Sequence, residues 1–123
     1  MEQLLLHLLG DYVLQSDWMA RNKTQATWPA LCHATLYSLP FLLIGTPLAV
    51  LAIFGAHFVM DRFRLARCVV WMKNWMGPAH VPWRECSSTG MPKDTPEWLA
   101  VWIMIAVDNT IHLAWNYAAL RWL

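Results

Sequence analysis

Charged side chains are scarce in this sequence. Asp, Glu, Lys and Arg make up 14% of the 123 residues, whereas hydrophobic residues make up 58%. A soluble domain usually carries about 25% charged residues, so the composition indicates an integral membrane protein in contact with a lipid bilayer. The formal net charge is only +1, which argues against a nucleic-acid partner, because phosphate binding needs clustered Lys and Arg.

Cysteine is also rare. The three cysteines are an odd number and have no CxxC spacing: Cys32, Cys68 and Cys86. This pattern indicates neither a disulfide framework nor a zinc ribbon. We expect buried or reduced thiols.

Long apolar runs divide the chain into four predicted helices, and one loop separates the last two. The helices are expected at 3–20, 26–44, 47–76 and 96–122, with the loop at 77–95. The short uncharged turn Gly45-Thr46-Pro47 makes the second and third helices an antiparallel hairpin. The sequence therefore predicts a single all-α membrane domain over residues 1–123, a bundle of four helices of which three to four are transmembrane.

The basic residues predict an orientation. Arg and Lys follow the first predicted helix and lie between the third and fourth, whereas the turn at 45–47 has none. The positive-inside rule puts both basic connections, including the long loop, in the cytoplasm and both termini outside. We therefore expect a multi-pass protein of a bacterial inner (cytoplasmic) membrane. The loop is then either a lid over a cytoplasmic mouth or a plain connector.

Three His/Asp pairs with a four-residue spacing lie inside these apolar runs. Residues four apart share one face of a helix, and ionisable groups are costly in hydrocarbon, so they mark a functional site by default. In the predicted orientation every pair places its Asp nearer the cytoplasm than its His. A further histidine lies in the remaining apolar run. We therefore predict one shared site from His7, Asp11, His33, His57, Asp61, Asp108 and His112.

Imidazole and carboxylate ligands together suit Zn, Mn or Fe better than Mg or Ca. Seven ligands exceed the three or four of one catalytic zinc. They fit two ions, or one ion whose imidazoles are oriented by carboxylates. Polar residues one turn further along the same faces are expected to support the site: Gln15, Tyr37 and Asn116. The alternative is that these side chains only hold the helices together by hydrogen bonds.

The spacing of these residues resembles a known family. The motif runs His7-Leu-Leu-Gly-Asp11-Tyr-Val-Leu-Gln15-Ser-Asp17-Trp18, then Lys23, His33, His57-Phe-Val-Met-Asp61-Arg62, and Asp108 with His112. It resembles a family of small bacterial and phage membrane proteins with a domain of unknown function. It is also loosely similar to integral membrane proteins described as predicted metal-dependent hydrolases. The family brings no established activity, whereas the second likeness, which is to residue type and setting only, implies hydrolysis.

The function expected from these observations is metal-dependent hydrolysis of a small or lipid-linked substrate, such as a phosphate ester. Asp61 is the first candidate for the general base, and Asp11 is the other catalytic candidate. Arg62 and Arg64 would contact a phosphate head group; the alternative is that they only anchor the cytoplasmic side of the helix. Two alternatives remain. The same residues would serve a proton or metal-ion conduit formed by a homo-oligomer. A phage accessory protein of the holin or exclusion type would act by contacts alone, and the His/Asp pairs would then be dispensable.

Overall fold

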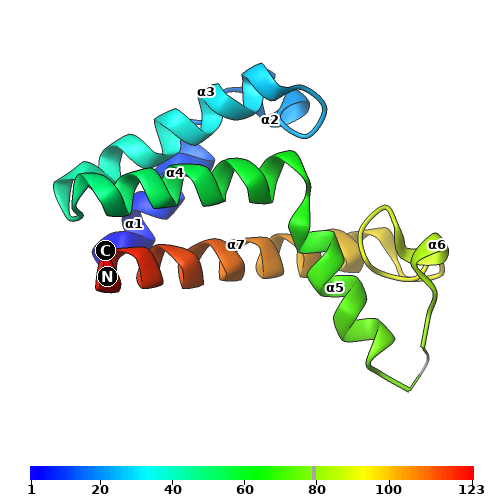
Figure 1. Ribbon diagram of the computed structural model, residues 1–123. Helices are drawn as coiled ribbons and strands as arrows, with labels where there is room; N and C mark the ends of the chain where they lie inside the picture. Colours follow the sequence, from blue (N-terminus) through cyan, green and yellow to red (C-terminus); the bar gives the residue numbers. More distant parts are fainter. Residues whose placement is uncertain (79) are drawn as a thin grey trace. The chain divides into compact units, whose positions relative to one another are not determined.

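The computed structural model describes residues 1–78 and 80–123. These residues form helices, turns and irregular segments and contain no strand, so the predicted all-α class is confirmed. Figure 1 shows the order of the elements along the chain. Their bounds are α1 Glu2–Leu8, the π-helix η1 Leu9–Val13, α2 Asp17–Asn22, α3 Thr27–Ser38, the 3₁₀ helix η2 Leu39–Leu43, α4 Pro47–Arg62, α5 Leu65–Trp75, α6 Trp83–Cys86 and α7 Glu97–Trp122.

The contacts divide the chain into two compact units. The first unit consists of Met1–Phe63 and His112–Leu123, and the second of Arg64–Ile111. Every helix except α7 lies within one unit.

The predicted helix over 3–20 is interrupted in the structure. The α-helical turns of α1 pass into the π-helical η1, and the next helix, α2, begins at Asp17. Ser16 caps the N-terminus of α2, because its hydroxyl accepts a hydrogen bond from the backbone N–H of Met19. A side chain that caps a new helix favours a break in the preceding one.

Helices α3 and α4 form the predicted antiparallel hairpin of the first unit (Figure 1). The α-helical part of the first arm ends at Ser38, and Pro40 lies in the 3₁₀ helix η2, as expected for a residue that lacks an N–H donor. The second arm begins with a cap, in which Thr46 Oγ1 accepts from the N–H of Ala49. The apolar core of this unit is Tyr37, Phe41, Val50, Ile53 and Ala119.

The predicted helix over 47–76 is two helices, α4 and α5. The break falls at Arg64, which adopts the left-handed conformation with φ 53° and ψ 50°. This conformation cannot continue a right-handed helix. Its guanidinium donates a hydrogen bond to the carbonyl oxygen of Ser88, 2.9 Å away. The residue at the break therefore contacts a residue 24 positions further along the chain.

In the second unit the predicted loop is fixed to α5. Trp71 Nε1 donates to the carbonyl of Val81, Arg67 Nη1 to that of Ser87, and Asn74 Nδ2 to that of Gly90. Gly90 has φ 82°, and a Cβ there would collide with the Arg67 carbonyl oxygen. The segment also contains the short helix α6. The described residues 80–95 are therefore held against α5 by hydrogen bonds.

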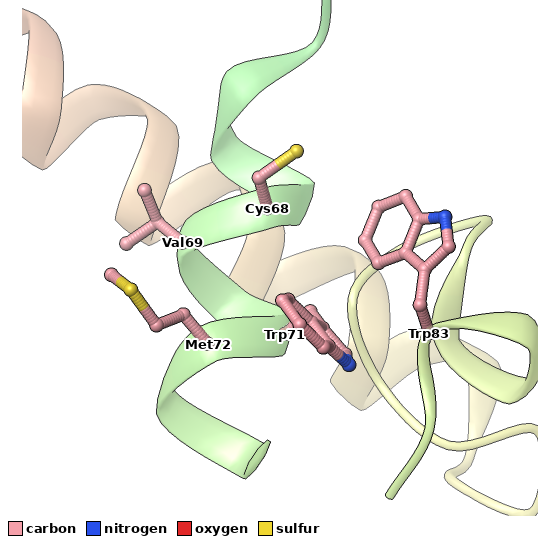
Figure 2. Close-up of a pocket in the computed structure, with 5 residues that line it drawn as sticks. All are labelled: Cys68, Val69, Trp71, Met72 and Trp83. Atoms are coloured by element: carbon pink, nitrogen blue, oxygen red, sulfur yellow. The ribbon is translucent and has the colours of Figure 1, made fainter. Parts of the chain in front are cut away.

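An open apolar cavity of about 370 Å³ lies in the same unit (Figure 2). It is lined by side chains of α5 and by one tryptophan at the start of α6: Cys68, Val69, Trp71, Met72 and Trp83. The ring of Trp83 lies edge-on to Trp71, with their centroids 5.5 Å apart, and the Arg67 guanidinium lies over its face. The tryptophan is thus held in place by its neighbours.

Helix α7 has 26 residues and is, among the described helices, the one long and apolar enough to cross a membrane. At 1.5 Å per residue it extends about 39 Å, more than the roughly 30 Å of a hydrocarbon core. The other long helices, α3 and α4, have 12 and 16 residues. The structure thus supports one candidate span.

Candidate metal centre

The first unit brings together imidazole and carboxylate side chains from its separate helical segments. Asp11 comes from η1, His33 from α3, His57 and Asp61 from α4, and His112 from α7. The three histidines are at most 1% exposed, and Asp61 is 7% exposed. The four-residue spacing of α4 places both of its polar side chains on the buried face, as the sequence predicted.

The ligand atoms lie at the distances that one bound ion requires. His33 Nε2 is 2.9 Å from His57 Nε2, and Asp61 Oδ2 is 3.1 Å and 3.2 Å from these two nitrogens. With metal–ligand bonds of about 2.0–2.1 Å, atoms around one ion are about 2.8–3.0 Å apart in octahedral and about 3.3–3.4 Å apart in tetrahedral geometry. The observed spacing falls in this range.

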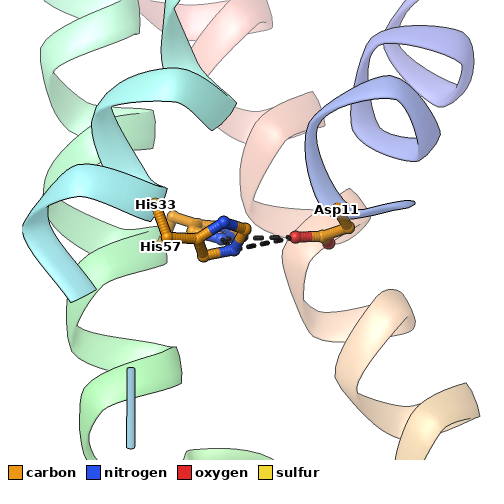
Figure 3. Close-up of side chains that lie close together, drawn as sticks. All are labelled: Asp11, His33 and His57. Carbon is orange, nitrogen blue, oxygen red and sulfur yellow. Dashed lines mark hydrogen bonds and ion pairs between the residues drawn. The ribbon is translucent and has the colours of Figure 1, made fainter. Parts of the chain in front are cut away.

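Asp11 faces the same two histidines from η1 (Figure 3). Its Oδ1 atom is 3.2 Å from His33 Nε2 and 3.5 Å from His57 Nε2. Two groups could therefore hold a metal ion: Asp11 with His33 and His57, and His57 with Asp61 and His112. His57 belongs to both.

Buried polar atoms in the cluster also point to a cation. Within the described part of the chain, Asp11 Oδ1 and Asp61 Oδ2 are buried and make no hydrogen bond of acceptable geometry, although both face imidazole nitrogens. Two carboxylates buried close together are costly. Lys23 compensates the charge of Asp61, and a bound cation would offset the cost of the second carboxylate. The residues present therefore fit a metal ion in both donor chemistry and spacing.

Lys23 is also part of this cluster, although the sequence pattern indicates only a basic residue of a cytoplasmic connection and of the family motif. Its Nζ atom lies 2.7 Å from Asp61 Oδ2 and 3.2 Å from His33 Nε2. The side chain is 18% exposed. Its only sequence signal is its place in the motif with the His/Asp pairs, because no helical spacing links it to them.

A second layer of polar side chains surrounds the cluster. Tyr37 Oη lies 2.7 Å from His7 Nδ1 and accepts a hydrogen bond of 2.7 Å from Asn116 Nδ2. The Tyr37 ring is stacked on His57 with centroids 3.6 Å apart. His7 Nδ1 is also 3.4 Å from Asp11 Oδ2. Tyr37 and Asn116, predicted as supporting residues, thus lie beside the cluster, and His7 lies beside the two ligand groups and belongs to neither.

The remaining predicted residues have different positions. Asp108 is half-buried in the second unit and is in neither ligand group. Gln15 Nε2 donates to the backbone carbonyl of Asp11. Arg62 Nη1 donates to the carbonyl of Thr24 at 2.9 Å. Arg64 contacts Ser88, as described above.

These observations define an all-α protein with a buried His/Asp cluster that could hold a metal ion. The chain belongs to the family described as protein of unknown function (DUF3307), which matches residues 1–82. That match includes every cluster residue except His112 and the supporting Asn116. It confirms the resemblance to a family of unknown function. No curated protein and no solved structure matches the chain.

Proposed function

We propose that this protein is a membrane-embedded, metal-dependent hydrolase that acts on a phosphate ester or a lipid-linked substrate. The observation that carries the proposal is the convergence of four side-chain atoms. Three are candidate ligands, Nε2 of His33 and His57 and Oδ2 of Asp61, and the fourth is a neighbouring carboxylate oxygen, Oδ1 of Asp11. Each nitrogen lies within 3.5 Å of both oxygens. Mixed imidazole and carboxylate ligands favour Zn, Mn or Fe, as one or two ions.

The two carboxylates would have different roles. The Asp61 side chain is 5% exposed and contacts His33, His57 and Lys23, which suits a ligand. The Asp11 side chain is 12% exposed, which suits a general base that must reach water. When bound, the ion would supply Lewis-acid activation of water and of the scissile group. Asp11 would take the proton from the attacking water, and His7, 3.4 Å from its other oxygen, would orient it.

Two cations near the cluster favour an anionic substrate. Lys23 borders the cluster directly, and Arg62 donates to the Thr24 carbonyl in the adjacent connection. Lysine and arginine side chains near a membrane interface are common contacts of phosphate head groups. Asp11 and Lys23 are also the least buried members of the cluster, so substrate would enter on this side.

Membrane insertion is supported by apolar surface. Exposed side chains on the α3–α4 hairpin include Trp28, Leu42, Leu43, Leu48 and Leu51, and a large exposed apolar surface marks contact with lipid or a partner. Helix α7 supplies one span of sufficient length. We propose that the hairpin and the N-terminal helices join it as a multi-pass bundle in a bacterial inner membrane, with both termini outside, and that a homo-oligomer shields the shorter helices.

The test is reconstitution of the purified full chain in liposomes, with metal content and turnover measured on the same sample. We expect bound Zn, Mn or Fe, and hydrolysis of a soluble aryl phosphate ester or a phospholipid. Asp11→Asn should keep the metal and lose turnover, whereas His57→Ala should lose both. The exposed His80, which contacts the Trp75 carbonyl, provides the control His80→Ala. Metal-dependent ion flux without turnover would instead favour the conduit. Turnover that survives His57→Ala would contradict the proposed centre.

A further inference from the structure

We infer that Lys23 is an internal counter-cation of the metal centre, and that metal binding releases its ammonium group from Asp61 and His33. This inference rests on the metal centre proposed above and adds a residue that the metal-ligand pattern does not include. Three observations support it: the contact of Lys23 with His33 Nε2, its ion pair with Asp61, and the hydrogen bonds that hold the Lys23 backbone in place.

The first argument concerns the His33 imidazole. Lys23 Nζ lies 3.2 Å from His33 Nε2 and forms a hydrogen bond with it. An ammonium group has three donors and no acceptor, so Nε2 of His33 must accept through its lone pair. A metal ion would bind His33 through the same lone pair, since Nε2 is the atom that faces Asp11, His57 and Asp61. Lys23 and a metal ion therefore compete for one atom.

The second argument concerns charge. Lys23 Nζ is 2.7 Å from Asp61 Oδ2, and the Asp61 side chain is only 5% exposed. An ion bound to that oxygen at about 2.1 Å would lie no more than about 5 Å from the ammonium nitrogen. A divalent cation and an ammonium group at this separation repel strongly where little water screens them. The repulsion favours release of the lysine side chain once the ion is bound.

The third argument is that the backbone can stay in place while the side chain moves. The Lys23 N–H donates to the Met19 carbonyl at the end of α2, and Arg62 of α4 holds the next carbonyl, that of Thr24. The lysine side chain is already 18% exposed, so rotation about its side-chain bonds would bring Nζ to the surface. Binding of the ion would thus present a free ammonium group at the edge of the centre.

The experiment measures the reactivity of the lysine amines in the wild-type full chain. The protein has three lysines, and Lys73 and Lys93 are both exposed, so they serve as internal controls. Chelator-treated and Mn²⁺- or Zn²⁺-saturated samples are labelled with an amine acylating reagent, and each lysine is quantified by mass spectrometry. We expect Lys23 labelling to rise about tenfold on metal binding, within the usual range of coupling between two linked events. Labelling of Lys73 and Lys93 should not change.

A matched pair of variants tests the competition directly. Lys23→Met removes the ammonium group, and the control Arg21→Met removes a cation of α2 whose partner is the exposed Asp17. We expect Lys23→Met to bind Mn²⁺ or Zn²⁺ about tenfold more tightly than wild type, with Arg21→Met unchanged. Unchanged Lys23 labelling together with unchanged affinity in Lys23→Met would overturn the inference and leave the metal centre intact. If neither wild type nor Lys23→Met binds metal, the centre itself is wrong and the inference fails with it.

Discussion

The Nε2 atoms of His33 and His57 lie 2.9 Å apart, although they come from the two arms of one hairpin. Two imidazole nitrogens this close share either one proton or one ion. The Lys23 ammonium contacts the same nitrogen, His33 Nε2, so Lys23 and His57 compete for its single lone pair. His57 further stacks on Tyr37 and lies beside His112, with ring centroids 3.6 Å and 4.3 Å away. His57 therefore contacts His33, Tyr37 and His112 at the same time.

Replacement of His57 should therefore abolish metal binding. His57 belongs to both ligand groups, and loss even of a residue that only supports a ligand commonly lowers metal affinity about 10–100-fold. We expect His57→Ala to lower affinity by at least about 100-fold, as measured by elemental analysis and titration. Membrane insertion should be unchanged, because the substitution makes α4 more apolar. Full metal occupancy in the variant would leave only interhelical hydrogen bonding as the role of the cluster.

Asp108→Asn tests the one predicted ligand that lies in the second unit. The sequence pattern groups Asp108 with His112, whereas the ligand groups include His112 and not Asp108. If Asp108 is a ligand, as the spacing predicts, elemental analysis of Asp108→Asn should show lower metal content. An unchanged content would remove it from the predicted ligand set and leave the other residues unaffected.

Gly10 and Gly55 form a matched pair for a packing prediction. A Cβ at Gly10 would lie 2.5 Å from Tyr37 Cδ2, whereas one at Gly55 would meet nothing within 4 Å. Gly10→Ala should destabilise the protein by about 1–3 kcal/mol or more through overpacking. It should also lower metal affinity, because it displaces the tyrosine beside His57. Gly55→Ala should stabilise helix α4 by about 0.5–1 kcal/mol. Thermal unfolding in detergent measures both, and equal effects would contradict the close approach at Gly10.

Tyr37→Phe removes the hydroxyl that contacts both His7 and Asn116. The change leaves buried polar groups without this partner, so we expect a loss of about 1–3 kcal/mol in stability. The stacking on His57 is retained, so metal affinity should fall much less than in His57→Ala. Tyr117→Phe is the control, because Tyr117 is 56% exposed. Equal melting temperatures for the two variants would show that the buried network contributes little.

The predicted orientation is tested by cysteine accessibility. Thr46 lies at the turn that is expected outside, and Ser88 lies in the segment expected in the cytoplasm; both are exposed. In a background without the three native cysteines, Thr46→Cys should react with an impermeant maleimide added outside the cell. Ser88→Cys should react only after permeabilisation. The reverse pattern would invert the topology and remove the argument that each Asp lies nearer the cytoplasm than its His.

Two native cysteines of the second unit should differ in reactivity. Cys86 is fully buried, and its burial, with the nearby carboxylates of Glu85 and Asp94, raises the pKa of the thiol. A raised pKa leaves less thiolate at pH 8, and the thiolate is the reactive form. Cys68 is exposed at the apolar cavity. We expect an apolar maleimide to modify Cys68 at least about tenfold faster than Cys86 in the folded protein, as measured by mass spectrometry. The two rates should become similar after denaturation.

Parts of the fold that depend on distant contacts were not predictable from local patterns. The apolar period continues through 47–76, yet the helix breaks at Arg64, where the backbone turns left-handed and the side chain binds the Ser88 carbonyl. Apolar periodicity also continues past Ser16, where a cap begins a new helix. Such breaks depend on single side chains and their partners. A hydrophobic pattern is read over a window of many residues and does not detect them.

The sequence by itself determined the helical class and the polar residue types on each helical face, because both depend on residues close together along the chain. A four-residue spacing places His57 and Asp61 on one helical face whatever surrounds them. Only the tertiary structure decided which polar faces converge. It brings Lys23 to Asp61 across 38 positions of sequence, and it places His7 against Tyr37 rather than in a ligand group. Convergence depends on how each helix is rotated against its neighbours, and that rotation is fixed by side-chain packing such as the close approach of Gly10 to Tyr37.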